Sequence, residues 1–336
     1  MEFKRMGERT VKLSRPPVIA AGACVVGKKE GQGPLAGSFD AIENDSFFGE
    51  KSWEKAESEM QRRALSVALE KAGRVRGDVD YVFAGDLLNQ CISSSFALRE
   101  SGIPFFGVYG ACSTMAESLA LAAMSIDGGY ARCAAAVTSS HFCTAERQFR
   151  FPLEYGGLRT PTAQWTVTGA GAFILESDGQ GPRITHATCG RIVDWGVTDA
   201  NNMGAAMAPA AYDTLRAHFN DTGRGPKNFD LIVTGDLGAV GSAILTDLFR
   251  RDGIELKSRH RDCGMMIFSH KQQDVKSGGS GCGCSASVLA GYLLDGFNRG
   301  KWNSVLFAAT GALLSAVSTQ QKESIPGICH AVSLEV

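Results

Sequence analysis

The sequence carries almost no net charge and contains no hydrophobic run long enough to span a membrane. It has 34 Lys and Arg residues against 35 Asp and Glu residues, which gives a net charge of -1. Nucleic-acid binding and electrostatic attachment to membranes both depend on a basic surplus, so the composition disfavours both. No stretch approaches the roughly 18 consecutive apolar residues of a transmembrane helix. We therefore expect neither a nucleic-acid partner nor a membrane-spanning segment.

Motifs that bind nucleotides or metal ions are also missing. There is no Walker motif, and the glycine-rich residues 278–283 lack the acidic residue about 20 positions further on that a dinucleotide fingerprint requires. Cys282 and Cys284 form a CxC pair, but no second pair of Cys or His residues accompanies it. We therefore expect no cofactor and no metal site.

The N-terminal region only loosely imitates a secretory signal. Basic residues precede the apolar residues 18–26, and Ala-Gly-Ala-Cys at 21–24 imitates a lipoprotein cleavage site. However, the run is short, contains a glycine, and follows an unusually long charged segment with Pro16 and Pro17. We predict that it is the first strand of the core and that it is not a signal peptide.

The chain repeats a pattern of strands and helices. Residues 81–87 and 231–237 are short apolar runs that end in Gly-Asp, which is typical of buried strands. Each run follows an amphipathic helix, predicted at 52–72 and at 205–219. The acids that end the two runs, Asp86 and Asp236, therefore occupy equivalent positions.

The repeat continues in the same order further along each half. Residues 110–114 open an alanine-rich helix that leads to a strand at 134–138, and residues 281–284 open a helix through 294 that leads to a strand at 305–310. The fold class is therefore α/β, built from a duplicated α/β unit with mixed or mostly parallel sheets. The Gly/Pro-rich residues 178–182 divide it into a first half, 1–178, and a second half, 179–336.

Cys112 is the leading candidate for a functional residue. The apolar residues 103–109 predict a strand that runs straight into it, and a helix begins immediately afterwards. This places the sulfur at a helix N-terminus, where the helix dipole and free N–H groups stabilise a thiolate or a bound anion. The alternative is a buried structural cysteine, which is the commonest role of this residue.

Other candidates also lie at strand ends or in the loop that follows. His141 follows the strand at 134–138, and its alternative is an ordinary loop histidine. Asp86 is a candidate ligand contact, although capping of the next helix would explain it equally well. Arg147 and Arg150, in the polar and aromatic segment 144–152, could hold carboxylates, or they could belong to a solvated loop. Cys284 lies in the second-half equivalent of the Cys112 turn.

Motifs over nearly the whole chain carry a family resemblance. The duplicated unit, the position of Cys112 and the Gly-Ala-Gly-Ala strand at 168–175 resemble the thiolase-like superfamily, whose condensing enzymes keep their nucleophile where Cys112 lies. More closely, the chain resembles the stage V sporulation protein AD (SpoVAD) family. The segments that carry this second resemblance are 51–54 (KSWE), 84–90 (AGDLLNQ), 109–114 (YGACST), 144–150 (TAERQFR), 207–211 (MAPAA), 309–315 (ATGALLS) and 320–323 (QQKE).

The resemblance implies both a fold and a function. It implies a thiolase-like fold with layers in the order α-β-α-β-α, and a plausible homodimer. It also implies direct binding of dipicolinic acid (pyridine-2,6-dicarboxylic acid), free or as its calcium chelate, during loading of the developing spore. Such a protein would work with the membrane proteins of the SpoVA group and be peripheral to the spore inner membrane.

Within that resemblance, the second half favours a binding protein over an enzyme. Condensing enzymes activate the thiol with a base and with His or Asn from their second half. Here Gly235 and Asp236 stand where a His would be expected, and an acid raises the pKa of a neighbouring thiol. We expect Cys112, Asp86, His141, Arg147, Ser315 and Cys284 to line or approach a degenerate pocket.

Two alternatives to the binding protein stay open. One is a thioester condensing enzyme or acyltransferase that uses Cys112 as its nucleophile together with His141. The other is an assembly protein whose ancestral pocket has no ligand.

Overall fold

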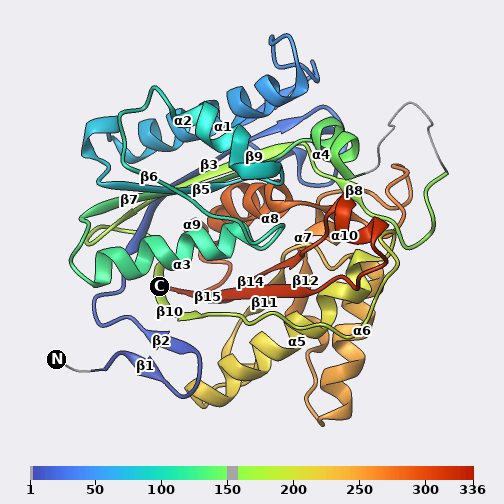
Figure 1. Cartoon of the computed structure of the whole chain (residues 1–336). Coiled ribbons are helices and arrows are strands. Elements are labelled where there is room, and N and C mark those ends of the chain that lie inside the picture. Colours follow the sequence, from blue (N-terminus) through green and yellow to red (C-terminus); the bar gives the residue numbers. More distant parts are fainter. Residues whose placement is uncertain (1–2, 150–157) are drawn as a thin grey trace.

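A computed structural model of the chain, which describes residues 3–149 and 158–336, has two sheets alternating with three layers of helices (Figure 1). The outer helices α1 (Trp53–Ala72) and α2 (Ile92–Leu98) cover the first sheet, and α5 (Met203–Thr222) and α6 (Gly238–Arg251) cover the second. Between the sheets lie α3 (Thr114–Asp127) and a long segment that comprises α8 (Cys282–Val288), a π-helical turn (Leu289–Leu293) and α9 (Leu294–Asn298). The predicted α-β-α-β-α order is confirmed.

The five main strands of each sheet have the same topology. In each, a short edge strand and the next two strands are parallel, and the last two strands are antiparallel. Arg183 opposite Val18 is the register pair that joins the two sheets. The order is β6 (Phe105–Gly107), β5 (Tyr81–Gly85), β7 (Cys133–Ser140), β9 (Gly169–Glu176) and β3 (Val18–Gly27) in the first sheet, and β12 (His260–Asp262), β11 (Leu231–Thr234), β14 (Ser304–Ala312), β15 (Gly327–Glu335) and β10 (Arg183–Thr188) in the second.

Local sequence explains the boundaries of the predicted helices. Ser52 caps α1 by accepting a hydrogen bond from the Lys55 N–H, and Gly73 ends the helix in the left-handed conformation (φ +63°) that glycine adopts at little cost. The helix predicted at 205–219 is α5, which starts slightly earlier because Asn202 caps it. The apolar residues 18–26 form the core strand β3, as predicted.

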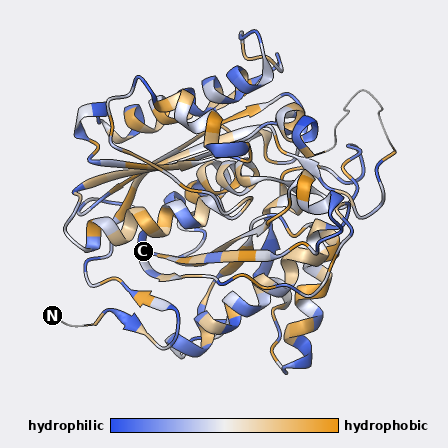
Figure 2. Cartoon of the chain, viewed as in Figure 1, coloured by the Kyte–Doolittle hydropathy of each residue, from blue (hydrophilic) through white to orange (hydrophobic). Residues whose placement is uncertain are grey.

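Hydrophobic residues concentrate on the strands and on the inner helices (Figure 2). β7 and α8 are buried along their whole length. The predicted strand at 103–109 is wrong in extent, because only β6 is extended there and its three residues are exposed at the edge of the sheet. The other strands and α-helices of the described residues are β1 (Arg5–Met6), β2 (Thr10–Lys12), β4 (Ala41–Glu43), α4 (Phe142–Phe149), β8 (Trp165–Thr166), α7 (Cys263–Met266), β13 (Gly279–Ser280) and α10 (Ala316–Gln320).

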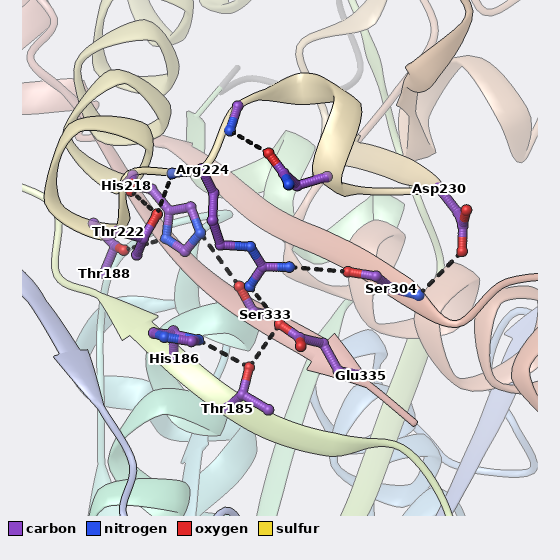
Figure 3. Close-up of polar contacts among 12 residues, drawn as sticks. Thr185, His186, Thr188, His218, Thr222, Arg224, Asp230, Ser304, Ser333 and Glu335 are labelled. Carbon is purple, nitrogen blue, oxygen red and sulfur yellow. Dashed lines mark hydrogen bonds and ion pairs between the residues drawn. The ribbon is translucent and has the colours of Figure 1, made fainter.

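A buried polar network fastens α5 and the loop that follows it to the second sheet (Figure 3). The His218 ring bonds to the Thr188 hydroxyl (2.8 Å) and to the Ser333 hydroxyl (3.3 Å). Burial lowers the pKa of His218 to about 3, so the ring is neutral near pH 7. Arg224 donates to Glu335 on β15 at 2.5 Å. These bonds account for polar groups far from Cys112, and we assign them a structural role.

Candidate functional site

A cavity of about 210 Å³ lies where the two halves meet, with Cys112 in its wall. Most of the lining is apolar. The small sheet of β8 and β13 crosses between the halves here, with Thr166 opposite Ser280. The first half contributes Leu87, Tyr109, Ala111, Cys112, Ala145, Glu146, Phe149, Gln164 and Thr166, and the second half contributes Ala200, Asn201, Met203, Ser280, Ala312 and Leu314.

A tight turn positions Cys112 ahead of α3. Ala111 has a positive φ of +50°, and the Thr114 hydroxyl donates to its carbonyl at 2.6 Å. The end of β14 approaches this turn so closely that a Cβ on Gly311 would lie 2.3 Å from the Gly110 carbonyl oxygen. Only glycine fits there, so the second half helps to fix the conformation around the thiol. Cys112 lies between β6 and α3, as predicted, but β6 ends at Gly107 and does not run directly into it.

The surroundings of Cys112 keep its thiol protonated. Burial raises the pKa of Cys112 well above its usual value, and the neighbouring Asp236 carboxylate raises it further. That carboxylate accepts hydrogen bonds from the Thr310 hydroxyl (2.8 Å), the Ser280 hydroxyl (2.8 Å) and the Gly281 N–H (2.9 Å). Since the thiolate is the reactive form, this environment opposes nucleophilic catalysis.

His141 is not arranged as a base for Cys112. Its Nε2 lies 2.8 Å from the Ser46 carbonyl oxygen, and its Nδ1 accepts a hydrogen bond from the Cys143 N–H. The two bonds define the neutral tautomer with the proton on Nε2. Burial lowers the pKa of His141. The ring packs edge-on against Phe48, and the residue is absent from the cavity lining.

Asp86 is buried behind Leu87 and does not line the cavity. It accepts hydrogen bonds from the Leu88 N–H and from both the N–H and the hydroxyl of Ser94. A second buried carboxyl, Glu57, accepts hydrogen bonds from Ser139 and Thr144. Burial, and then the charge of Asp86, raise the pKa of Glu57 to about 8. Glu57 thus joins α1 to α4 and Asp86 bonds to α2, so the two acids form a buried acidic pair next to the cavity wall.

The other predicted residues are dispersed. Arg147 is exposed, pairs with Glu54, and lies over the Trp53 ring. Ser315 caps α10 and lines a groove of about 410 Å³ that shares Tyr109, Phe149 and Leu314 with the cavity. Cys284 is fully buried with its sulfur 3.8 Å from the Gly235 carbonyl. Arg150 lies outside the described residues. Of the six predicted residues, Cys112 alone lines the cavity and Ser315 lies next to it.

Several lining residues escaped the sequence analysis. Gln164 donates from Nε2 to the Asp236 carbonyl (2.5 Å) and the Gly279 carbonyl (3.0 Å), so it ties the two halves together beneath the cavity. Glu146 and Asn201 also face the cavity. Glu146 lies one residue before Arg147 in the polar segment 144–152. The sequence therefore indicated the correct segment but the wrong residue within it. No periodicity or motif identifies Gln164 or Asn201.

Comparisons with solved structures identify the class of fold. The chain is similar to 3-oxoacyl-(acyl-carrier-protein) synthase III from Aquifex aeolicus, with a TM-score of 0.58 and 14% identity over 95% of this chain and all of that one. It is also similar to a variant of OleA from Xanthomonas campestris, with a TM-score of 0.61 and 14% identity over 96% and 98% of the two chains. At this identity the likeness shows the fold alone, which is that of the thiolase-like condensing enzymes.

Sequence comparison identifies the family. Residues 7–335 match the model of stage V sporulation protein AD (SpoVAD). Stage V sporulation protein AD of Bacillus subtilis (strain 168) is 45% identical over 333 residues, which cover 99% of this chain and 98% of that one. The chain therefore belongs to the SpoVAD family of sporulation proteins. Within the described parts of the chain, no helix combines the length and apolar character needed to cross a bilayer.

Proposed function

We propose that the cavity at Cys112 binds dipicolinic acid and that it does so without catalysis. The observation that carries this proposal is the pairing of Cys112 with Asp236. Asp236 occupies the place where a condensing enzyme needs a base. Three hydrogen bonds hold its carboxylate in position. The ancestral position of the nucleophile is kept as part of a binding site, while the means of activating the thiol is absent from the residues described around it.

The size and lining of the cavity suit a small planar ring. A volume of about 210 Å³ lies below the roughly 300–1,000 Å³ of sites for drug-sized ligands, so it favours a ligand about the size of one aromatic ring. Tyr109, Phe149 and Met203 provide apolar surface for the ring faces. Thr166 and Asn201 provide hydrogen-bond donors for carboxylate oxygens. The sequence analysis offered Arg147 as a residue that could hold a carboxylate, and the lining favours Thr166 and Asn201 instead.

Family membership supports a proposal for the wider role of the protein. We propose that the protein takes part in moving dipicolinic acid, free or as its calcium chelate, into the developing spore. In this role it is peripheral to the spore inner membrane and acts with membrane proteins of the SpoVA group. The sporulation family supports this proposal, and the mostly apolar, ring-sized cavity gives it a binding site.

We also propose a homodimer formed through the edge strand β6. Phe105 and Phe106 are exposed on this strand, and Phe96 on α2 is exposed beside it. An unpaired strand edge with exposed aromatic residues is a surface that proteins normally cover. A second copy of the chain is the simplest partner, because two β6 strands related by a two-fold axis can pair edge to edge.

Calorimetric titration with dipicolinic acid tests the binding function. We expect saturable binding by the wild-type protein and loss of binding in Cys112→Phe, because the added ring fills the cavity. Cys112→Ala tests whether the sulfur itself contributes. Cys284→Ala is the matched control, since it changes a buried cysteine outside the lining.

Two results would redirect the proposal. Acylation of Cys112 by an acyl-CoA, detected by mass spectrometry, would favour the condensing enzyme, whose fold this chain shares. Failure of the wild-type protein to bind dipicolinic acid, together with partner binding that survives every cavity substitution, would favour the assembly protein.

A further inference from the structure

The cavity presents an electrostatic problem for an anionic ligand. Among the described residues that line it, Glu146 is the one with a charged side chain, and its charge is negative. A dicarboxylate that entered the cavity would meet a carboxylate of like charge, which disfavours binding. Among the described residues, a cation that can offset this repulsion lies behind the lining residues.

Arg159 lies directly behind that wall. Its Nη2 donates to Glu146 Oε1 at 2.9 Å, and its Nη1 donates to the Gln164 carbonyl oxygen at 2.8 Å. Both Glu146 and Gln164 line the cavity. The side chains of the ion pair are only 13% and 7% exposed, so solvent screens them weakly.

Aromatic stacking holds the guanidinium in this position. Phe142 and Trp165 stack with their ring centroids 4.0 Å apart and their planes 13° apart. The Arg159 guanidinium lies 5.1 Å from the Phe142 centroid and 4.6 Å from the Trp165 centroid. A planar guanidinium on aromatic faces keeps its orientation and loses little entropy when it binds a carboxylate.

The alternation of side chains along the short strand β8 explains why cationic side chains lie behind the apolar wall of the cavity. Successive side chains alternate in direction along a strand, so Gln164 and Thr166 line the cavity while Trp165 lies between them on the other side. The Lys29 ammonium lies 3.7 Å from the Trp165 centroid, so a second cation accompanies Arg159 there. The charges of Glu30 and then Asp274 act on Lys29, and each favours its charged form.

We infer that Arg159 is the residue that recognises a carboxylate of the ligand, and that Glu146 competes with the ligand for it. This inference rests on the proposed dipicolinic acid binding. A ligand carboxylate takes the Glu146 side of the guanidinium, whose fork of N–H donors matches a carboxylate. The Glu146–Arg159 pair thus sets the charge preference of a cavity whose walls are mostly apolar.

Substitutions of the two partners test the inference, because they predict effects of opposite sign. By calorimetry with dipicolinic acid, Arg159→Gln should weaken binding by about tenfold or more, which is typical for loss of a charge-assisted contact. Glu146→Gln should strengthen binding by about threefold to tenfold, because it removes the competing charge. Arg159→Lys should fall between the wild type and Arg159→Gln. A purely structural ion pair predicts that both neutral variants weaken binding, since each removes a buried contact that holds the cavity wall in place.

Simpler ligands sharpen the test. Pyridine carries the ring without carboxylates, so Arg159→Gln should change its binding by less than about twofold. Equal losses for pyridine and dipicolinic acid, or weaker dipicolinic acid binding in Glu146→Gln, would overturn the inference while leaving the proposed function in place. If the wild-type protein binds no dipicolinic acid, the proposed function fails and this inference fails with it.

Discussion

Asp86 and Asp236 occupy equivalent positions in the two halves, but their side chains have different surroundings. Each follows a Gly at the end of a parallel strand, β5 or β11. The Asp86 carboxylate bonds within its own half, to Leu88 and Ser94. The Asp236 carboxylate faces the boundary between the halves and lies beside the Cys112 thiol. The duplicated backbone thus determines the position of each acid, and the residues around each acid determine which groups it binds.

Asp262 explains why the two acids diverge. Located at the end of β12, it accepts hydrogen bonds from the N–H groups of Leu237 and Gly238, at the start of α6. In the first half, Asp86 itself accepts the hydrogen bond from the loop after β5, at the Leu88 N–H. Because Asp262 takes over that task in the second half, Asp236 can bond to Ser280 and Thr310 at the cavity.

We expect the largest effect when each of the two acids is replaced by alanine and the loss of protein stability is compared. Asp236→Ala removes the acceptor for two hydroxyls and one N–H, all buried at the junction of the halves, and should lower the free energy of unfolding by about 3 kcal/mol or more. Asp86→Ala also removes the acceptor for three donors, but these are one hydroxyl and two N–H groups within one half, so we expect about 2 kcal/mol. Guanidinium denaturation measures both values. An equal or larger loss in Asp86→Ala would contradict the central role assigned to Asp236.

The carboxyl pair of the first half predicts a dependence of stability on pH. The pKa of Glu57 is about 8 in the folded protein and has a usual value of 4.5. Between these values the folded state binds more protons than the unfolded state, so this group's stabilisation is complete below about pH 4.5 and is lost as pH rises toward 8. The slope is at most about 1.4 kcal/mol per pH unit.

Glu57→Gln isolates this contribution. The variant should reduce the fall in unfolding free energy across the interval without abolishing it, because burial also raises the pKa of Asp262, to about 7. Denaturation curves at several pH values between 5 and 8.5 provide the measurement. Identical slopes for the variant and the wild type would show that Glu57 does not hold the extra proton.

The edge strands of the two sheets predict which one is a subunit interface. β12 has the sequence His-Arg-Asp, whereas β6 has Phe-Phe-Gly. Charged residues protect an exposed edge, and aromatic residues invite a partner. Phe105→Glu should therefore raise the dimer dissociation constant by about thirtyfold or more, while Arg261→Glu leaves it unchanged. Light scattering coupled to size-exclusion chromatography measures the molar mass of each variant and so its oligomeric state. A wild-type protein that is monomeric at micromolar concentration would rule out the proposed dimer.

Much of the fold could be predicted because the pattern along the chain is local. Apolar runs, the Ser52 cap and the Gly73 stop define elements through interactions between residues close in sequence. The position of Cys112 followed from the same rules. Strand β6 was predicted too long because an apolar stretch does not reveal whether a neighbouring strand, or a second copy, covers it.

The site itself was harder to predict because its partners are distant in sequence. Cys112 meets Ser280 across 168 positions, and Gln164 meets Asp236 across 72. Conversely, Asp86 and His141 stand at strand ends, as predicted, but their side chains are engaged by Ser94 and Ser46. Position at a sheet edge is encoded locally, whereas the direction of a side chain depends on what the fold packs against it.

The smallest expected effect concerns the reactivity of Cys112. Asp236→Asn replaces the carboxyl group beside the thiol with a neutral amide, which should lower the pKa of Cys112 and speed its alkylation by iodoacetamide by about threefold to tenfold at pH 8. Asp86→Asn is the control and should leave the rate unchanged, while the exposed Cys189 serves as an internal reference. Mass spectrometry of the labelled peptides gives the rates. An unchanged rate in Asp236→Asn would mean that burial alone keeps the thiol unreactive. The acid at position 236 would then not be what distinguishes the proposed binding site from a catalytic one.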